Sequence, residues 1–255
     1  MNEPPALRIN HFLAQAGICS RRKADELIAG QRVRLNGEIA APGSKVTAAD
    51  QVTLDGKKIP WPATINAAPD APANERFAYI LLNKPVQVVS TVHDPQNRTT
   101  VLDLLPEELR RLRLFPVGRL DYFSQGLLIL TNDGNLTYRL THPKWHMPKV
   151  YHVLVRGRVT ESALRAMRDG MTLSEGESVA PVDCRILRLT PKNDTWLEMI
   201  LHQGINRQIR RMLRDLNLTI LRLARVRQGS LALGELKAGE WRHLSAEEVR
   251  ALQEG

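Results

Sequence analysis

The chain has 255 residues, 43% of them hydrophobic, so it can bury a core in one large domain or in two smaller ones. Its 36 Lys and Arg residues against 27 Asp and Glu give a formal charge of +9, which favours an anionic partner, most often nucleic acid; a basic protein without such a partner is the alternative. Two cysteines exclude a disulfide framework, and no apolar run approaches the ~18 residues of a membrane helix. The start of the chain lacks the basic and apolar regions of a signal peptide, so we expect a cytoplasmic protein.

Residues 7–59 are predicted to form a compact unit of two helices followed by short strands. Apolar residues at positions 9, 12, 13 and 16 have the spacing of one helix face, and Gly17 can end that helix. Ser20 can cap the second helix. After it the apolar period changes to two, and Asn36-Gly37 is a typical hairpin turn.

Basic residues gather around the start of the second predicted helix. Cations there oppose the helix dipole and so do not serve helix stability, whereas the free backbone N–H groups at that end favour anions. Phosphate binding is therefore favoured over a solvated charged face. The RNA-binding residues predicted in this part are Arg21, Arg22, Lys23, Arg32 and Arg34.

A stretch rich in Ala, Pro, Asn and Asp follows and has no hydrophobic periodicity, which is typical of a linker. We therefore predict a first domain at 1–60, a linker at 61–75 and a second domain at 76–255. In the second domain, strands are predicted at 77–82, 127–131, 150–155, 183–190 and 195–202, and helices at 106–112, 134–141, 160–169, 206–216 and 245–252. Because strands and helices do not alternate regularly, the fold class is α+β rather than a doubly wound sheet.

The segment from Gly118 to Gly134 holds a carboxylate, Asp121, just before an apolar run that is predicted to be a strand. Taken alone, such an aspartate is most simply a cap or turn residue. Its apolar neighbours are poor turn residues, however, and a carboxylate among apolar groups needs a partner to stay ionised. Arg119 supplies a nearby cation. Both interpretations stay open at this point.

Several separated motifs of this chain resemble two known families. The run from Ala16 to Ala24, with Arg32 to Gly37 after it, resembles the S-four-type RNA-binding domain. The second domain resembles the pseudouridine synthases of ribosomal RNA, and the similarity implies a mixed, mainly antiparallel β-sheet flanked by helices. The motifs that carry it are Asn83-Lys84-Pro85, Pro116 to Asp121, Thr141-His142-Pro143, Lys149-Val150-Tyr151, Gly204 to Met212, Leu223 to Gly229 and Trp241-Arg242.

The resemblance implies a role for each matched residue. Asp121 would be the nucleophile that attacks a flipped-out uridine, Tyr151 would stack on the base, and Arg210 would pair with Asp121. Arg119 would brace the gap that the nucleotide leaves, while Arg207 and Arg211 would bind phosphates. Without the resemblance, Tyr151 is more simply a core aromatic, and Arg210 can be part of a solvated basic helix face. No cofactor is implied.

The predicted function is site-specific pseudouridine formation in ribosomal RNA, with large-subunit RNA favoured. The expected partner is ribosomal RNA or an assembling ribosomal subunit, and the chain is expected to act as a monomer away from membranes. The alternatives are a synthase for small-subunit or transfer RNA and a non-catalytic RNA-binding or ribosome-assembly protein. No metal is expected, because Pro143 argues against the helix that would bring His142 and His146 together.

Overall fold

The computed structural model describes residues 6–61 and 77–254. It divides the chain into two compact units, Met1–Pro72 and Ala73–Gly255. Apart from Trp61, the predicted linker at 61–75 lies outside the described residues.

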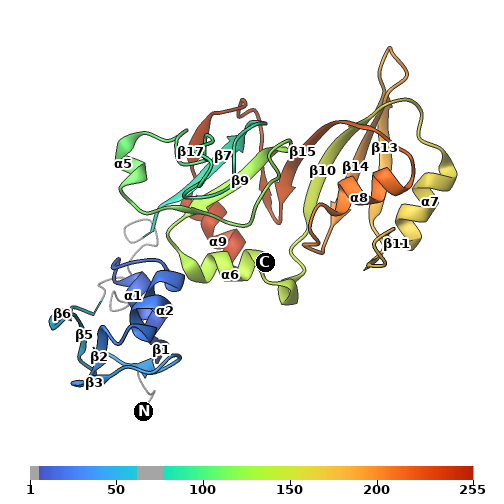
Figure 1. The fold of residues 1–255 in the computed structure, drawn as a ribbon. Helices are drawn as coiled ribbons and strands as arrows, with labels where there is room; N and C mark the ends of the chain where they lie inside the picture. The colour runs from blue at the N-terminus through green and yellow to red at the C-terminus, as the bar shows by residue number, and fades with distance from the viewer. Residues whose placement is uncertain (1–5, 62–76, 255) are drawn as a thin grey trace. The chain divides into compact units, whose positions relative to one another are not determined.

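In the first unit, two helices pack against a small antiparallel sheet with the strand order β3-β2-β5-β6 (Figure 1). Ser20 caps α2 by accepting a hydrogen bond from the backbone N–H of Lys23. Asn36 and Gly37 both have positive φ, as a tight turn between β2 and β3 requires. The elements are β1 (Leu7–Arg8), α1 (Ile9–Gln15), α2 (Arg21–Ala29), β2 (Val33–Leu35), β3 (Glu38–Ile39), β4 (Lys45–Val46), β5 (Val52–Leu54) and β6 (Lys57–Ile59).

The second unit is built on one mixed sheet with the order β13-β14-β10-β15-β9-β7-β17, in which β16 also pairs with β15 and β8 with β9. The elements are β7 (Tyr79–Lys84), α5 (Glu107–Arg110), β8 (Phe115–Pro116), β9 (Gln125–Thr131), α6 (Gly134–Thr141), the 3-10 helix η1 (Pro143–Trp145), β10 (Lys149–Val155), α7 (Glu161–Asp169), β11 (Met171–Thr172), β12 (Ser178–Val179), β13 (Asp183–Leu189), β14 (Thr195–Leu201), α8 (Gln208–Asp215), β15 (Ile220–Gln228), β16 (Leu231–Ala232), β17 (Trp241–His243) and α9 (Ala246–Glu254). The strand pairs of this sheet are antiparallel except β15 with β9. The predicted α+β class, with a mainly antiparallel sheet, is confirmed.

Three apolar cores hold the helices on this sheet. One joins α7 and α8 to β10, β13 and β14, with Val153 and Met212 fully buried. On the other half of the sheet, Leu127 of β9 faces α6 and α9, whereas the next residue, Leu128, faces α5 and the preceding loops. Tyr151 packs against the core beneath α7 and α8 and also against the core that contains Leu128. It therefore lies where the two halves of the sheet meet.

The parallel contact between β15 and β9 depends on Gly126. Its φ is +108°, and a Cβ at this position would lie 2.2 Å from the backbone oxygen of Arg225. A larger residue would therefore push the two strands apart, and glycine also tolerates this backbone conformation. This contact sets the spacing of the two halves of the sheet directly beside the Asp121 loop.

The predicted elements agree with the structure wherever the local signal was strong. The helices at 134–141 and 160–169 and the hairpin near residues 191–194 are present, but α5 is limited to Glu107–Arg110 and β7 starts at Tyr79 rather than at residue 77. The long strand β15 was not predicted as a strand, although it lies in the middle of the sheet.

Candidate active site

The Asp121 side chain projects from a tightly held loop between β8 and β9. The hydroxyl of Ser90, which is 6% exposed, donates to the backbone oxygen of Leu120 at 2.9 Å and accepts from its N–H at 3.1 Å. The N–H of Ser124 donates to the backbone oxygen of Asp121 at 2.9 Å, which closes a turn. The backbone here does form a turn, but the carboxylate is turned to cations rather than to a backbone cap.

Two arginines at the start of α8 approach this carboxylate. The Nε of Arg210 lies 3.3 Å from Asp121 Oδ2, and Arg207 Nη1 lies 3.8 Å from the same oxygen. The other end of the Arg210 guanidinium donates to the backbone oxygen of Phe123 at 2.8 Å and to the hydroxyl of Ser124 at 3.0 Å. Burial lowers the pKa of Arg210, while the charge of Asp121 acts in the opposite direction. Arg210 therefore orients both the carboxylate and the loop that carries it.

Lys84 is a third cation of this site, and the sequence assigned it no role. Its side chain is fully buried, and Nζ donates to the backbone oxygens of Pro85 at 2.8 Å and Ser124 at 2.9 Å. Burial lowers its pKa to about 8, while the negative charge of Asp121 favours the protonated lysine. The available signal was a lysine directly after the apolar run of β7, within the Asn83-Lys84-Pro85 motif.

Asp121, Tyr151 and Arg210 line one cavity of about 320 Å³. Its wall includes the Asp121 loop, the start of α8 and parts of β10 and β15. Three segments far apart in the sequence thus meet around a space that can hold a small planar ring, with a carboxylate at one side and an aromatic ring at another. Such a cavity suits nucleophilic attack on a base or sugar drawn into it.

The basic residues predicted to bind RNA fall into two groups. Arg119 and Arg207 are exposed on the rim of the cavity, where a backbone phosphate can reach them. Arg211 is not free in this way, because its side chain is only 16% exposed and pairs with Glu175 and Glu177 at 3.2 and 2.6 Å. The structure therefore favours an anchoring role for Arg211 over phosphate binding.

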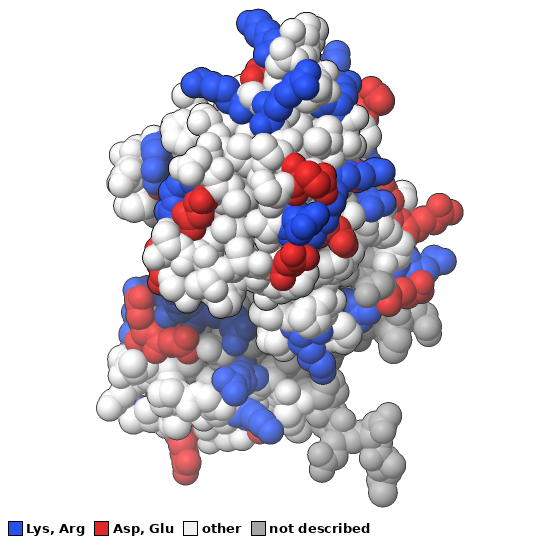
Figure 2. Space-filling model, turned by 90° about the vertical axis from the view of Figure 1, so that its right-hand side faces the viewer, with Lys and Arg blue, Asp and Glu red and all other residues white. Residues whose placement is uncertain are grey.

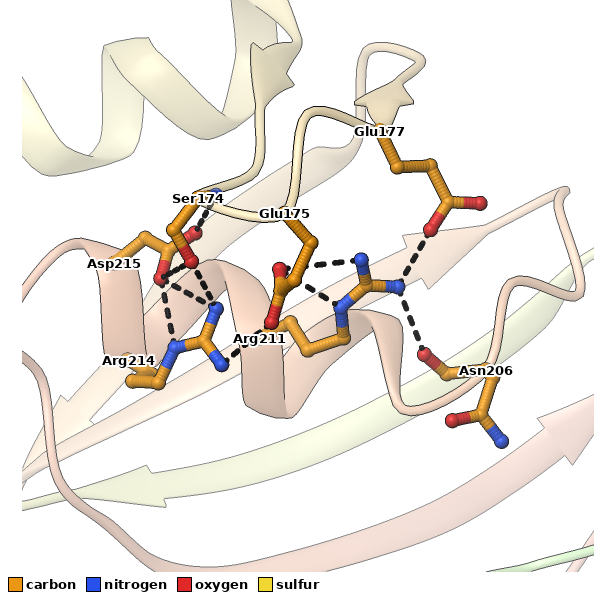
Figure 3. Close-up of polar contacts among 7 residues, drawn as sticks. All are labelled: Ser174, Glu175, Glu177, Asn206, Arg211, Arg214 and Asp215. Atoms are coloured by element: carbon orange, nitrogen blue, oxygen red, sulfur yellow. Dashed lines mark hydrogen bonds and ion pairs between the residues drawn. The ribbon is translucent and has the colours of Figure 1, made fainter.

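Arg211 belongs to a network that ties α8 to the loop after β11 (Figure 3). Its neighbour Arg214 contacts Glu175 at 2.8 Å and Asp215 at 2.7 Å, and Asp215 also accepts from the N–H of Ser174 at 2.8 Å. Hydrogen bonding to Arg214 lowers the pKa of Glu175, whereas burial raises it. The net result is a pKa of about 2. Acidic and basic side chains lie intermixed at the centre of the face in Figure 2 rather than as a continuous positive patch.

All five predicted RNA-binding residues of the first unit are exposed. Lys23 contacts Glu26 at 2.7 Å, Arg32 makes a two-point contact with Asp55, and Arg34 donates to the backbone oxygen of Gly37 at 3.0 Å. Exposed pairs of this kind are weak and can open when a phosphate competes.

Among the described residues, no group of His, Cys, Asp and Glu is arranged to hold a metal ion, and no helix is long and apolar enough to cross a membrane.

Comparison with known proteins gives matches over both units. The sequence model of the RNA pseudouridylate synthase family matches residues 78–215, and that of the S4 domain matches residues 7–52. The ribosomal large subunit pseudouridine synthase B of Bacillus subtilis (strain 168) is 36% identical over 248 residues, which cover 96% of this chain and 95% of that protein. An uncharacterized RNA pseudouridine synthase of Aquifex aeolicus (strain VF5) is 41% identical over 249 residues, which cover 96% of this chain and 93% of that protein.

A solved structure agrees with the sequence matches. The crystal structure of a pseudouridylate synthase superposes with a TM-score of 0.67 at 28% identity and covers 96% of this chain and 99% of the other. With the carboxylate, aromatic and arginine of the cavity in the matched region, these findings show that the chain belongs to the RNA pseudouridylate synthase family and carries an S4 domain in its first unit.

Proposed function

We propose that this chain converts a specific uridine of large-subunit ribosomal RNA into pseudouridine, with Asp121 as the nucleophile. The observation that carries the proposal is the ion pair of Asp121 with Arg210, 3.3 Å apart, in the same cavity as Tyr151. A non-catalytic RNA binder has no use for a carboxylate among cations, because that carboxylate repels phosphate. A nucleophile, by contrast, must be ionised and held in place.

Arg119, Asp121 and Tyr151 have separate roles in the proposed reaction. A stacked uridine is beyond the reach of Asp121, so it must leave the stack, and exposed Arg119 is positioned to brace the gap. Asp121 attacks the flipped nucleotide, the bond between C1′ and N1 breaks, and the uracil turns while it is stacked on Tyr151. C1′ then bonds to C5, the bond to Asp121 breaks and frees the carboxylate, the hydrogen on C5 leaves as a proton, and N1 gains a proton. No atom is gained or lost overall, and the steps need no cofactor.

The two units have separate roles in this proposal. The S4 domain, residues 1–60, binds RNA through its exposed arginines and lysines, and residues 76–255 carry the catalysis, with residues 61–75 joining them. The division at Pro72 and the S4 match at 7–52 support these boundaries. We further propose that the protein acts in the cytoplasm, as a monomer, on ribosomal RNA or an assembling subunit.

The choice of large-subunit RNA rests on the relatives. The Bacillus subtilis protein is named for the large ribosomal subunit, and it aligns with nearly the whole chain. The test is primer-extension mapping of pseudouridine after carbodiimide treatment, in ribosomal RNA from cells with and without this gene. Loss of one reverse-transcriptase stop in large-subunit RNA supports the proposal. If the wild-type gene restores this stop and the Asp121→Asn gene does not, the reaction is assigned to Asp121. Loss of a stop in small-subunit or transfer RNA instead would overturn the assignment of the substrate.

A further inference from the structure

The floor of the active-site cavity carries polar groups that the mechanism above does not use. Arg225 and Gln228 of β15 are 3% and 1% exposed and line the cavity with Lys149 of β10. Arg225 is the register partner of Tyr151, and Gln228 that of Lys149, so these side chains lie on the same face of two neighbouring strands. They therefore form a continuous polar surface beside the ring of Tyr151.

Two atoms of this floor have no hydrogen-bond partner among the residues that the structure describes: Nη2 of Arg225 and Oε1 of Gln228. The Nε of Arg225 donates to the backbone oxygen of Leu127 at 2.8 Å, which fixes the direction of its guanidinium. Buried polar groups are nearly always paired in proteins, so unpaired ones in a cavity indicate groups that a ligand satisfies.

The floor is also strongly positive. Lys149 Nζ donates to the backbone oxygen of Met147 at 2.8 Å, which leaves two further N–H bonds. Burial and, to a smaller extent, the neighbouring charge of Arg225 together lower the pKa of Lys149 to about 8. Arg225 is buried and Lys149 is half-buried, so their charges repel each other, and a ligand with oxygen acceptors relieves that repulsion.

The part of an RNA chain that can reach this floor is a base. An internal nucleotide stays joined to the chain through both phosphates, so its phosphates remain near the rim, where Arg119 and Arg207 are exposed. A uracil stacked on Tyr151 can turn its edge towards β15, because Arg225 of that strand is the register partner of Tyr151. That edge has two carbonyl oxygens, which accept hydrogen bonds, and an N3–H, which donates one.

We propose that Arg225, Lys149 and Gln228 read the edge of the uracil, with the two cations donating to its carbonyl oxygens and Gln228 Oε1 accepting from N3–H. Cytosine would fit poorly, because its N3 is an acceptor facing an acceptor and its amino group is a donor facing cations. The inference rests on the proposed function, since it supplies the base specificity of that same site.

The same contacts serve the chemical step. When the bond from C1′ to N1 breaks, its electron pair stays on the uracil, and the negative charge spreads from N1 onto O2 and O4. Hydrogen bonds from Arg225 and Lys149 to these oxygens become stronger as that charge develops. Groups that bind the charged form better than the ground state accelerate the step.

The test uses free uracil, cytosine and N3-methyluracil as probes, titrated into the full-length protein and followed by calorimetry. Wild-type protein should bind uracil about 10- to 100-fold more tightly than either other base. N3-methyluracil removes the donor without altering the protein, so this comparison stands even where a variant fails to fold. Equal affinities for the three bases, or no uracil binding at about 10 mM, would overturn the proposal.

Substitutions then assign the residues. Gln228→Met keeps the length of the side chain but removes the acceptor. In this variant the ratio of the affinity for uracil to the affinity for N3-methyluracil should therefore fall towards one. Lys149→Met should weaken uracil binding by about tenfold, whereas Lys192→Met, in the exposed β13–β14 turn, is the matched control and should not. In Lys149→Arg the affinity should persist above pH 8, where that of wild type declines. A folded Gln228→Met protein with unchanged preference would remove Gln228 from the floor.

The outcomes separate this inference from the proposed function. If the base preference follows expectation but ribosomal RNA mapping shows no missing pseudouridine, the substrate assignment fails and the floor stands. If mapping shows a missing pseudouridine but the floor variants keep the wild-type base preference, the proposed function stands. The assignment of uracil recognition to Arg225, Lys149 and Gln228 is then wrong.

Discussion

Substitution of Arg210 tests whether the position of the carboxylate limits the reaction. Arg210 contacts Asp121 at 3.3 Å, the backbone oxygen of Phe123 at 2.8 Å and the hydroxyl of Ser124 at 3.0 Å, and its side chain is 18% exposed. Lysine keeps the charge but not the planar fork, so it loses at least one of these bonds. A hydrogen bond to a charged group contributes about 1.5–3 kcal/mol, so Arg210→Lys should slow the chemical step about 10- to 100-fold.

Arg210→Met removes the charge as well. It leaves Asp121 with Arg207 at 3.8 Å and with the charge of Lys84. The expected loss is about 4 kcal/mol, or on the order of 10³-fold. The assay is single-turnover release of tritium from RNA labelled at C5 of uridine, because that hydrogen leaves in the reaction. Exposed Arg165→Met on α7 is the matched control. A folded Arg210→Met protein with wild-type single-turnover rate would refute the positioning role.

Four further outcomes follow from the structure. Asp121→Asn should abolish turnover and leave RNA affinity, measured by filter binding, close to wild type; residual turnover would remove the nucleophile role. Gly126→Ala should lower the free energy of unfolding in denaturant titration by about 3 kcal/mol or more, because its Cβ would lie 2.2 Å from a backbone oxygen of β15; a neutral effect would contradict that contact. Replacing Arg21 and Arg22 by Gln should reduce the slope of log affinity against log salt by about 1.5 if both bind phosphate, and an unchanged slope would argue against the S4 domain as a phosphate clamp. Lys84 has a pKa of about 8 when folded, below its ordinary value of 10.5, so the unfolded chain binds more protons between these pH values and stability should rise with pH there; in Lys84→Met this rise should shrink, and an identical rise would show that Lys84 is not its source.

The first unit could be predicted from local signals because each of its elements is specified by a few adjacent residues. Ser20 caps α2, and Asn36 with Gly37 forms the turn after β2, as their residue types predict. Strand β15 lacked such a signal. Arg222, Arg225 and Arg227 interrupt its apolar residues, so it does not have the pattern of a buried central strand. The structure gives the reason, since Arg225 faces the cavity while the other two are exposed.

The site was less accessible to sequence reasoning than the fold. Asp121, Tyr151 and Arg210 are brought together by long-range packing, and only the resemblance to a family connected them before the structure did. Lys84 was missed because a lysine at the end of a strand usually extends into solvent. It is buried here, because the backbone oxygens of Pro85 and Ser124 satisfy its ammonium group.

The arginines of α8 show why residue spacing alone could not assign roles. Arg207, Arg210, Arg211 and Arg214 have the spacing of one helix face, which by itself indicates a solvated basic face. The helix begins only at Gln208, and Arg207 precedes it with a φ of +51°. Arg210 then turns to Asp121, whereas Arg211 and Arg214 turn to the carboxylates of the loop after β11. Because those two ion-pair sets are separate, loss of Arg210 should alter turnover while α8 stays anchored, and loss of Arg211 should first appear as a lower melting temperature.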